Sequence, residues 1–330
     1  MISLFRGITI VAAAGLLLGC GGSRHSSAGA DAGDTVRSVE SEDKSAEKWS
    51  FNADSAYRNV SRQVEFGPRI PGTASHKATA DWLSSELKRY GWMVTEQHST
   101  VKAFDGSQLP LRNIFAQINP EATDRTLLLA HYDTRPWADE DPDPTKRQQP
   151  IDGANDGGSG TGVLLEIARQ LGMSAPTGGI DILLVDCEDY GTSGDEESWA
   201  LGAGYFAAHP PIEGYKPARA ILLDMVGGKD GVFPAEYYSR QAAADIDDAI
   251  RLAARRIGEG ERFPGVYGGA VTDDHVKLIE RGIPAVDIIE YRAEGGFNAT
   301  WHTTSDTLDN IDRETLGAVG RTVMEYLKSI

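Results

Sequence analysis

The sequence is poor in cysteine and in positive charge, and it has no long apolar run. Its 330 residues include two cysteines, too few for a disulfide scaffold. Lys and Arg total 32 against 49 Asp and Glu, and the resulting formal charge of −17 argues against nucleic acid as a partner. No stretch reaches the roughly 18 uninterrupted apolar residues of a membrane-spanning helix. The rest is ordinary globular composition, with 40% hydrophobic and 25% charged residues.

The first 47 residues are typical of export and tethering. The N-terminal segment carries Arg6 and is followed by the apolar run 8–18. The end of this run belongs to Leu17-Leu18-Gly19-Cys20, which resembles a bacterial lipoprotein signal whose lipidated residue is Cys20. Residues 21–47 are small, polar and acidic, which favours a disordered tether. We therefore predict a signal peptide over 1–19, a tether over 20–47 and a single folded domain over 48–330. The protein is expected to be exported and lipid-anchored to a bacterial membrane; an ordinary cleaved signal peptide is the alternative.

Apolar runs of strand length alternate with helical patterns along the rest of the chain. A run that is mostly apolar, without alternation of apolar and polar residues, is expected of a strand buried on both faces. Four such runs occupy 126–132, 180–185, 220–225 and 285–289, and helical spacing marks 76–90, 159–171, 245–257 and 314–330. This alternation predicts an α/β fold, a three-layer sandwich with a central, mostly parallel sheet flanked by helices.

Histidines and carboxylates gather where these strands end. The carboxyl ends of parallel strands form the ligand-binding edge of such a sheet. The residues in question are His131, Asp133, Asp156 in the turn GANDGGSG, Glu188, Asp189, Asp224 and His302. Each has an ordinary explanation alone, since Asp156 could cap a helix and His131 could be a core histidine. Together they place charge at buried strand ends, which is costly unless a cation is bound, and mixed nitrogen and oxygen ligands suit zinc.

In this order, the motifs resemble the zinc aminopeptidase and glutaminyl cyclase superfamily from about residue 57 to the C-terminus. The family fold, a central mixed sheet between helices, agrees with the pattern above. The resemblance implies that a catalytic zinc is held by Asp156, Asp189 and His302. It also implies that Asp133 orients His131 beside these ligands.

Several features favour the bacterial glutaminyl cyclase branch. Trp301 directly precedes His302 and Phe297 stands four residues before Trp301, as pocket aromatics do in the cyclases. An acidic pair, Asp273-Asp274, precedes a histidine, as in the cyclases. The segment YGTSGDEESW follows Asp189, whereas in aminopeptidases the acid pair runs almost directly into a Gly-Leu turn. Asp189 replaces the Glu common in animal cyclases, and Trp199 does not align cleanly with their first pocket tryptophan. Trp199 could either pack in the core or line the substrate pocket.

The resemblance implies a zinc-dependent glutaminyl-peptide cyclotransferase, which converts the N-terminal glutamine of a peptide or protein to pyroglutamate and releases ammonia. One zinc ion is expected. In this interpretation Glu188 transfers the proton, Asp224 and Asp273 share protons with it, and Trp301, Phe297 and Trp199 hold the substrate.

Two other hypotheses use the same residues. In a two-zinc aminopeptidase, His131 and Asp224 are ligands of a second ion and Glu188 activates water. A non-catalytic surface binding protein with a degenerate metal site is the less favoured hypothesis, because all six superfamily positions are retained. The natural substrate, the number of ions and the oligomeric state stay open at this point.

Overall fold

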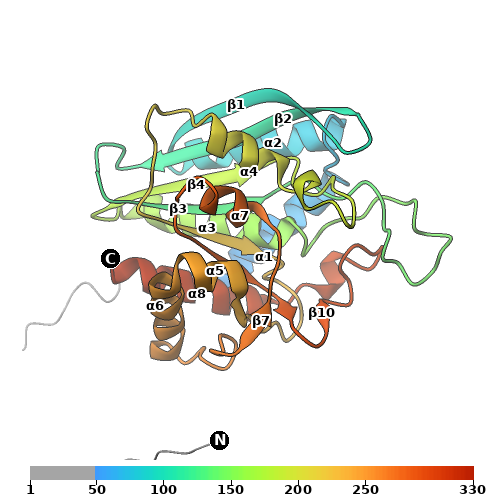
Figure 1. The fold of residues 1–330 in the computed structure, drawn as a ribbon. Coiled ribbons are helices and arrows are strands. Elements are labelled where there is room, and N and C mark those ends of the chain that lie inside the picture. Colours follow the sequence, from blue (N-terminus) through green and yellow to red (C-terminus); the bar gives the residue numbers. More distant parts are fainter. Residues whose placement is uncertain (1–48) are drawn as a thin grey trace, which may run out of the picture. The chain divides into compact units, whose positions relative to one another are not determined.

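A computed structural model describes residues 49–330 (Figure 1). The predictions for the signal peptide (1–19), the tether (20–47) and Cys20 lie outside these described residues. Within residues 49–330, no helix combines the length and the apolar character that crossing a bilayer requires.

A six-stranded sheet forms the centre of the molecule, in the order β1-β2-β4-β3-β5-β8. Its strands are β1 (Met93–Lys102), β2 (Gln108–Ile118), β3 (Arg125–His131), β4 (Gly179–Val185), β5 (Arg219–Asp224) and β8 (Ala285–Ile289). Strands β4, β3, β5 and β8 run parallel to their neighbours in that group, whereas β2 is antiparallel to both β1 and β4. The sheet is therefore mixed and mostly parallel.

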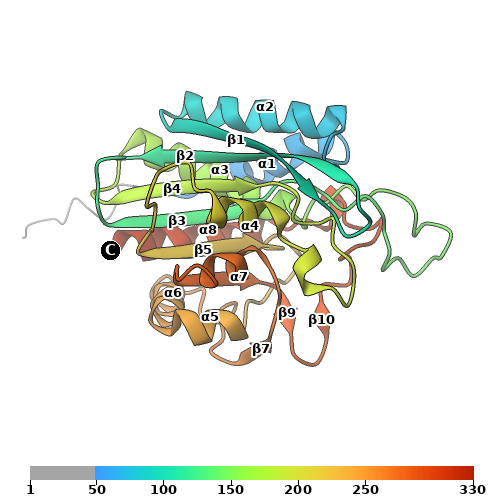
Figure 2. The same cartoon turned by 45° about the horizontal axis from the view of Figure 1, so that its top comes forward.

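Helices cover both faces of this sheet (Figure 2). They are α1 (Ala53–Glu65), α2 (Ala74–Arg89), α3 (Gly158–Met173), α4 (Leu201–Ala208), α5 (Tyr237–Ala242), α6 (Ala244–Arg256), α7 (Asp274–Ile279) and α8 (Arg313–Lys328). The smaller elements are the short strands β6 (Ala235–Glu236), β7 (Tyr267–Gly269), β9 (Tyr291–Arg292) and β10 (Gly296–Phe297), with the 3₁₀ turns η1 (Glu196–Ser198) and η2 (Leu308–Asn310).

The strand sequences explain why both faces are covered. Leu128 and Ala130 of β3 pack in the larger core, which also holds apolar side chains of α1, α2, α3, α6 and α8. Leu127 and Leu129 of the same strand point the other way, into a smaller core with side chains from α4 and α7. Side chains alternate across a strand, so a continuously apolar strand supplies two cores at once. The predicted three-layer α/β sandwich is confirmed.

The four predicted buried strands are confirmed to within a residue at their ends. The apolar pattern did not predict β2, whose sequence QLPLRNIFAQI mixes polar residues and a proline with the apolar ones. It also did not predict the short helices α4, α5 and α7. Since β2 is inserted antiparallel between β1 and β4, it makes the sheet mixed without changing the edge at which β3, β4, β5 and β8 end.

Helix α3 lies unusually close to the sheet, and Gly160 makes this approach possible. A Cβ atom at residue 160 would lie 2.0 Å from the Leu223 carbonyl oxygen of β5 and 3.0 Å from the Ala130 Cβ of β3. The first of these neighbours is backbone, which cannot move aside as a flexible side chain can. The glycine therefore sets the distance between the helix and the strands that carry the site described below.

We predict that Gly160→Ala destabilises the protein by about 1–3 kcal/mol, the usual cost of overpacking, despite the better helix propensity of alanine. The matched control is Gly178→Ala, because a Cβ there would meet its nearest neighbour, the Asp124 carbonyl oxygen, at an ordinary 3.6 Å. Urea unfolding of both variants measures the two free energies. An unfolding free energy for Gly160→Ala equal to that of the parent would show that the helix is not held at this distance.

Candidate active and metal site

The ends of three parallel strands bring the predicted chemical groups to one edge of the sheet. His131 is the last residue of β3 and Asp224 the last of β5. Beyond β4, Cys187 adopts a left-handed conformation with φ 56°, after which Glu188 and Asp189 follow. His302 has φ 51° itself. Such conformations cost of order 1–3 kcal/mol for residues other than glycine, and they are concentrated at functional sites.

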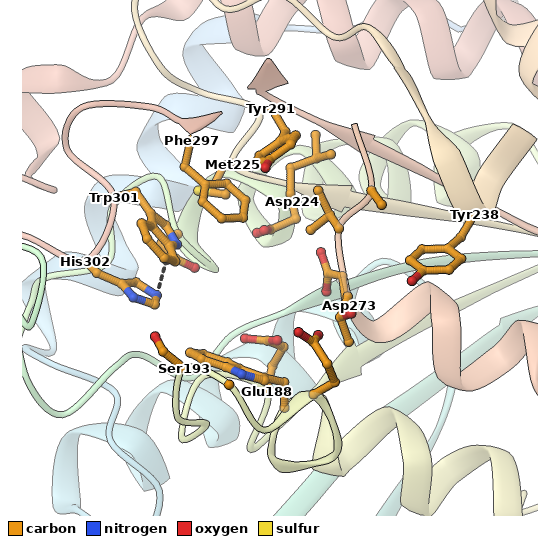
Figure 3. A pocket seen from close by; sticks show the side chains of 18 residues that line it. Glu188, Ser193, Asp224, Met225, Tyr238, Asp273, Tyr291, Phe297, Trp301 and His302 are labelled. Atoms are coloured by element: carbon orange, nitrogen blue, oxygen red, sulfur yellow. Dashed lines mark ion pairs between the residues drawn. The ribbon is translucent and has the colours of Figure 1, made fainter. Parts of the chain in front are cut away.

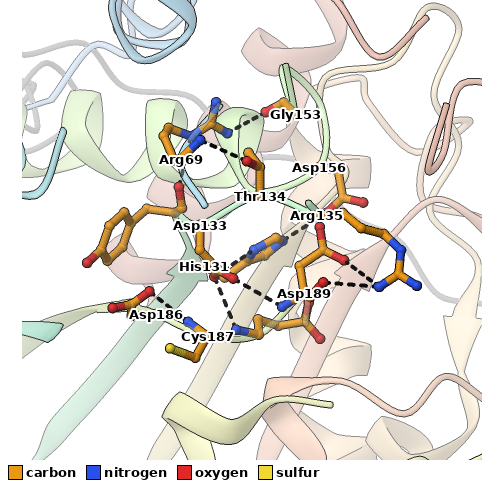
Figure 4. A network of polar contacts seen from close by, with 12 residues as sticks. Arg69, His131, Asp133, Thr134, Arg135, Gly153, Asp156, Asp186, Cys187 and Asp189 are labelled. Atoms are coloured by element: carbon orange, nitrogen blue, oxygen red, sulfur yellow. Dashed lines mark hydrogen bonds and ion pairs between the residues drawn. The ribbon is translucent and has the colours of Figure 1, made fainter. Parts of the chain in front are cut away.

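Two carboxylates hold the turns that carry the acidic residues. The Asp133 carboxylate accepts hydrogen bonds from the backbone N–H groups of Glu188 (3.1 Å) and Asp189 (3.2 Å). The Asp306 carboxylate does the same for Asn155 (2.7 Å) and for Asp156 (3.0 Å). Asp133 also lies 3.5 Å from Nδ1 of His131, at the position expected of a residue that orients the ring (Figure 4). One side chain thus accepts two hydrogen bonds from the acidic turn and also lies beside the imidazole.

The glycine-rich turn before α3 places Asp156 against His131. Gly157 has φ 76°, and a Cβ on this residue would lie 2.7 Å from the Asp133 carbonyl oxygen and 2.9 Å from Cε1 of His131. Only glycine fits such a conformation at such a distance. The turn can therefore place the Asp156 side chain among the histidines and acids of the site.

Asp156 joins two groups of possible metal ligands. Its Oδ1 lies 3.0 Å from Nε2 of His131, which in turn is 3.2 Å from Oδ1 of Asp224. Its Oδ2 lies 3.5 Å from Nε2 of His302, which is 3.1 Å from Oδ1 of Asp189. All five side chains are buried. The potential ligand atoms of each group lie within 4.8 Å of one another, a spacing that could hold a metal ion.

The two groups differ in how well their polar atoms are satisfied. In the described part of the chain, neither carboxylate oxygen of Asp189 has a hydrogen-bond partner, although both are buried. In the other group, Oδ1 of Asp224 does have a hydrogen-bond partner, Nε2 of His131 at 3.2 Å. An unsatisfied buried carboxylate is costly, and a cation removes that cost. The residues Asp156, Asp189 and His302 therefore fit a metal ion, and as a set of one nitrogen and two oxygen donors they suit zinc.

Burial and neighbouring acids raise the pKa values of several carboxyl groups here. Burial, reinforced by the charges of Asp273, Asp189 and Asp274, raises the pKa of Glu188 well above its usual range, against the influence of His131. Burial and then Asp224 raise the pKa of Asp273 to about 7. A carboxyl group with a pKa near neutrality exchanges protons readily at physiological pH.

These groups line a cavity of about 480 Å³ whose opposite wall is aromatic (Figure 3). The ring of Trp301 stacks on His302 with centroids 3.8 Å apart, and Phe297 stacks on Trp301 at 4.3 Å. Tyr291 meets Phe297 edge-on at 4.7 Å. The cavity can thus hold an apolar chain segment against the aromatic wall while a polar end reaches Glu188 and His302.

The structure brings together every residue that the sequence suggested for the site. Glu188, Asp224, Asp273, Trp301, Phe297, Trp199, Asp156 and His302 all line the cavity, and Asp189, His131 and Asp133 lie behind them. Trp199 also lies nearly parallel to the His302 ring, at 5.9 Å and 17°. It packs against Gly191, where a Cβ would approach its indole to 2.1 Å.

Other residues of the site were not predicted from the sequence. They are Asp306, Arg135 and Asp139, together with the cavity-lining Tyr291, Tyr238, Met225, Ser193 and Glu196. Asp306 stands four residues after His302, and an acid that close to a predicted ligand was a usable signal. His275 lies farther back, where its Nε2 is 3.1 Å from Oε2 of Glu236 and its Nδ1 is 3.7 Å from Oδ2 of Asp287.

Comparisons with known proteins agree with this geometry. The model of "Peptidase family M28" matches residues 113–327. The crystal structure of Porphyromonas gingivalis glutaminyl cyclase is similar with a TM-score of 0.83 and 51% identity, covering 84% of this chain and 98% of that one. A Zn-dependent exopeptidase from Parabacteroides distasonis is similar to the same degree, with a TM-score of 0.83, 51% identity and coverage of 85% and 99%. The glutaminyl-peptide cyclotransferase of Bos taurus is 25% identical over 296 residues, 78% of each chain.

Proposed function

The chain belongs to peptidase family M28, and within it to the bacterial glutaminyl cyclases. From this we infer that it is a glutaminyl-peptide cyclotransferase, an enzyme that closes the N-terminal glutamine of a peptide into pyroglutamate and releases ammonia. The observation that carries this conclusion is the aromatic wall of Trp301 and Phe297 stacked on His302, in the same cavity as Glu188, whose pKa is raised by burial. A binding protein with a degenerate site has no need of such an arrangement.

For the metal, we propose that one zinc ion is held by Asp156, Asp189 and His302. The unsatisfied oxygens of Asp189 support this ligand set. Three protein ligands leave a position for substrate, as a catalytic zinc site requires. Zinc bound there would polarise the γ-carbonyl of the substrate glutamine as a Lewis acid. His131 and Asp224 already satisfy each other at 3.2 Å, which supports a proton rather than a second ion between them.

In the proposed mechanism, Glu188 moves the proton. As a carboxylate it accepts a proton from the substrate α-amine, whose nitrogen attacks Cδ, the carbonyl carbon of the γ-carboxamide. It then returns a proton to the amide nitrogen, which leaves as ammonia when its bond to Cδ breaks. Its raised pKa makes it a better base when ionised and a ready donor once protonated. The charge of Asp273 raises the pKa of Glu188, and the charge of Asp224 raises the pKa of Asp273 in turn, so repulsion among these acids favours a shared proton over full ionisation.

The aromatic residues are proposed to hold the substrate. Trp301, Phe297 and Trp199 would press the glutamine side chain into a ring-closing conformation and keep out water, which would otherwise deamidate it. The stacking of Trp301 and Trp199 on His302 supports a second contribution, since both indoles restrict the orientation of a proposed metal ligand.

We predict that peptides beginning with glutamine and carrying a free α-amine lose one ammonia per molecule, while peptides beginning with leucine or alanine lose no residue. Mass spectrometry and an ammonia assay on the same reaction measure both outcomes. The same peptide with a blocked α-amine is the control, because it has no nucleophile. Release of leucine without ammonia from any Gln-peptide would establish the two-zinc aminopeptidase instead.

Glu188→Gln and Asp189→Asn should separate the proton carrier from the ligand at two adjacent positions. Gln at 188 cannot carry the proton, so turnover should fall by about 10²–10⁴ while zinc content stays near one ion per chain. Asn at 189 is a weaker ligand, so zinc and activity should be lost together. Elemental analysis and ammonia release on one Gln-peptide decide the assignment. Zinc loss in the first variant with retention in the second would reverse the two roles.

We also propose that Cys20 carries a lipid and that the enzyme is exported and anchored to a membrane by it. The motive is the small-residue segment ending at Cys20 after an apolar run. Multiple acyl chains on one terminus make a stable anchor. Cys20→Ala should release the protein from the membrane fraction without changing the turnover of Gln-peptides. Unchanged membrane attachment of this variant would refute the lipid anchor.

A further inference from the structure

Arg135 is a buried cation that the proposed mechanism does not use. It stands four residues beyond the end of β3, and 1% of its surface is exposed. Its Nε and Nη2 donate to the two carboxylate oxygens of Asp139 at 2.7 and 2.5 Å. Its Nη1 donates to the backbone carbonyls of Asp189 (3.1 Å) and Gly191 (3.2 Å). All three nitrogen atoms of the planar guanidinium thus donate hydrogen bonds, and they join the loop of Asp139 to the loop of Asp189 and Gly191.

Asp139, the partner of this guanidinium, also faces a proposed metal ligand. Its Oδ1 lies 3.5 Å from Nδ1 of His302, whereas Nε2 of the same ring points to Asp156 and Asp189. The two hydrogen bonds from Arg135 pair this carboxylate with a permanent positive charge. A carboxylate on the outer nitrogen of a metal-binding histidine fixes its tautomer and its orientation.

The second ligand beside Arg135 is Asp189. The Nη1 atom lies 3.7 Å from Oδ1 of this carboxylate, in addition to its bond to the Asp189 carbonyl (Figure 4). The carboxylates of Asp156 and Asp189 both lie against Nε2 of His302, at 3.5 and 3.1 Å, so two like charges are held close together and repel each other. A permanent cation at this distance opposes that repulsion and keeps two carboxylates side by side before any metal is bound.

The same guanidinium touches the wall of the cavity. Its central carbon lies 4.9 Å from the ring centre of Trp199 and 5.1 Å from that of Trp137. Trp199 lines the cavity, and the bond from Arg135 to the Gly191 carbonyl holds the segment against which its indole packs. Arg135 therefore contacts both the ligand side and the substrate side of the site, whereas Asp139 contacts only the ligand side.

We propose that the Arg135–Asp139 ion pair is a positioning device that sets His302 and Asp189 for metal binding and, through Arg135 alone, couples the metal site to the Trp199 wall. This inference rests on the ligand set of the proposed function. It implies that changes at the two residues have different effects on metal affinity and substrate binding. Loss of the Asp139 charge disturbs metal affinity, whereas a change at Arg135 disturbs metal affinity and substrate binding together.

The test uses the full-length zinc-loaded enzyme and the variants Asp139→Asn and Arg135→Lys. The matched control is Glu140→Gln, which removes a charge from the exposed residue next to Asp139. The backbone N–H of Glu140 donates a hydrogen bond to the His302 carbonyl, and this bond does not depend on the side chain. Competition with a chromophoric chelator gives the zinc dissociation constant. Steady-state ammonia release at saturating zinc gives KM and kcat for one Gln-peptide. Circular dichroism and thermal unfolding verify that each variant is folded.

Asp139→Asn is expected to weaken zinc binding by about 10- to 100-fold, the effect of losing such a partner of a metal-binding histidine, with KM unchanged once zinc is saturating. Arg135→Lys keeps a charge but loses the planar fork and the stacking on indole, so it should weaken zinc binding and also raise KM several-fold. Glu140→Gln should change neither quantity.

An Asp139→Asn variant that binds zinc as tightly as Glu140→Gln would overturn the proposal, and so would an Arg135→Lys variant with unchanged zinc affinity. If Arg135→Lys does not fold, the zinc affinity of Asp139→Asn decides alone. Failure of the cyclase function is a separate result: the parent enzyme would release no ammonia from Gln-peptides, while the zinc measurements would still test the ion pair.

Discussion

The repulsion among buried carboxylates at one edge of the sheet is the constraint on which the rest of the site depends. Asp156, Glu188, Asp189 and Asp224 are all buried there, and neighbouring carboxylates help burial to raise the pKa values of Glu188, Asp189 and Asp224. In a low-dielectric interior such a group must take up protons, pair with cations or bind a metal. In the proposed function each of these solutions applies at a different residue. Glu188 has a raised pKa and is the proposed proton carrier, Asp224 faces an imidazole, and Asp189, whose oxygens have no hydrogen bond within residues 49–330, is a proposed metal ligand.

Backbone hydrogen bonds keep the acids in place despite this repulsion. Asp133 and Asp306 each accept two backbone N–H groups from the turns that carry Glu188-Asp189 and Asn155-Asp156. Carboxylates that receive such bonds anchor a turn more strongly than neutral acceptors do. The acids proposed to act in catalysis and metal binding are thus supported by acids with no such proposed role. The buried guanidinium of Arg135 adds the opposite charge beside the turn that carries Asp189.

Much of this arrangement was predictable from the sequence, and the missing part has a physical cause. Strands β3, β4, β5 and β8 are mostly apolar because both of their faces are buried, so the pattern identified them and the edge where they end. Strand β2 was missed because Pro110 and its polar residues break that pattern. Arg135 and Asp139 were not assigned roles because the partners of a buried ion pair depend on how a loop folds back on distant turns. The individual catalytic and ligand roles stay predictions until the variants are measured.

Asp156 presents one oxygen to each of two histidines, and this has an evolutionary consequence. Exchanging a proton between His131 and Asp224 for a second divalent ion needs no change in any ligand residue. Divergence between metal-dependent peptidases and cyclases can therefore proceed through the loops around the cavity, such as the segment from Tyr190 to Trp199, while the ligands themselves stay constant. A lineage with this fold can therefore gain or lose the second ion by changes around the ligands, without an inactive intermediate that has lost its metal-binding residues.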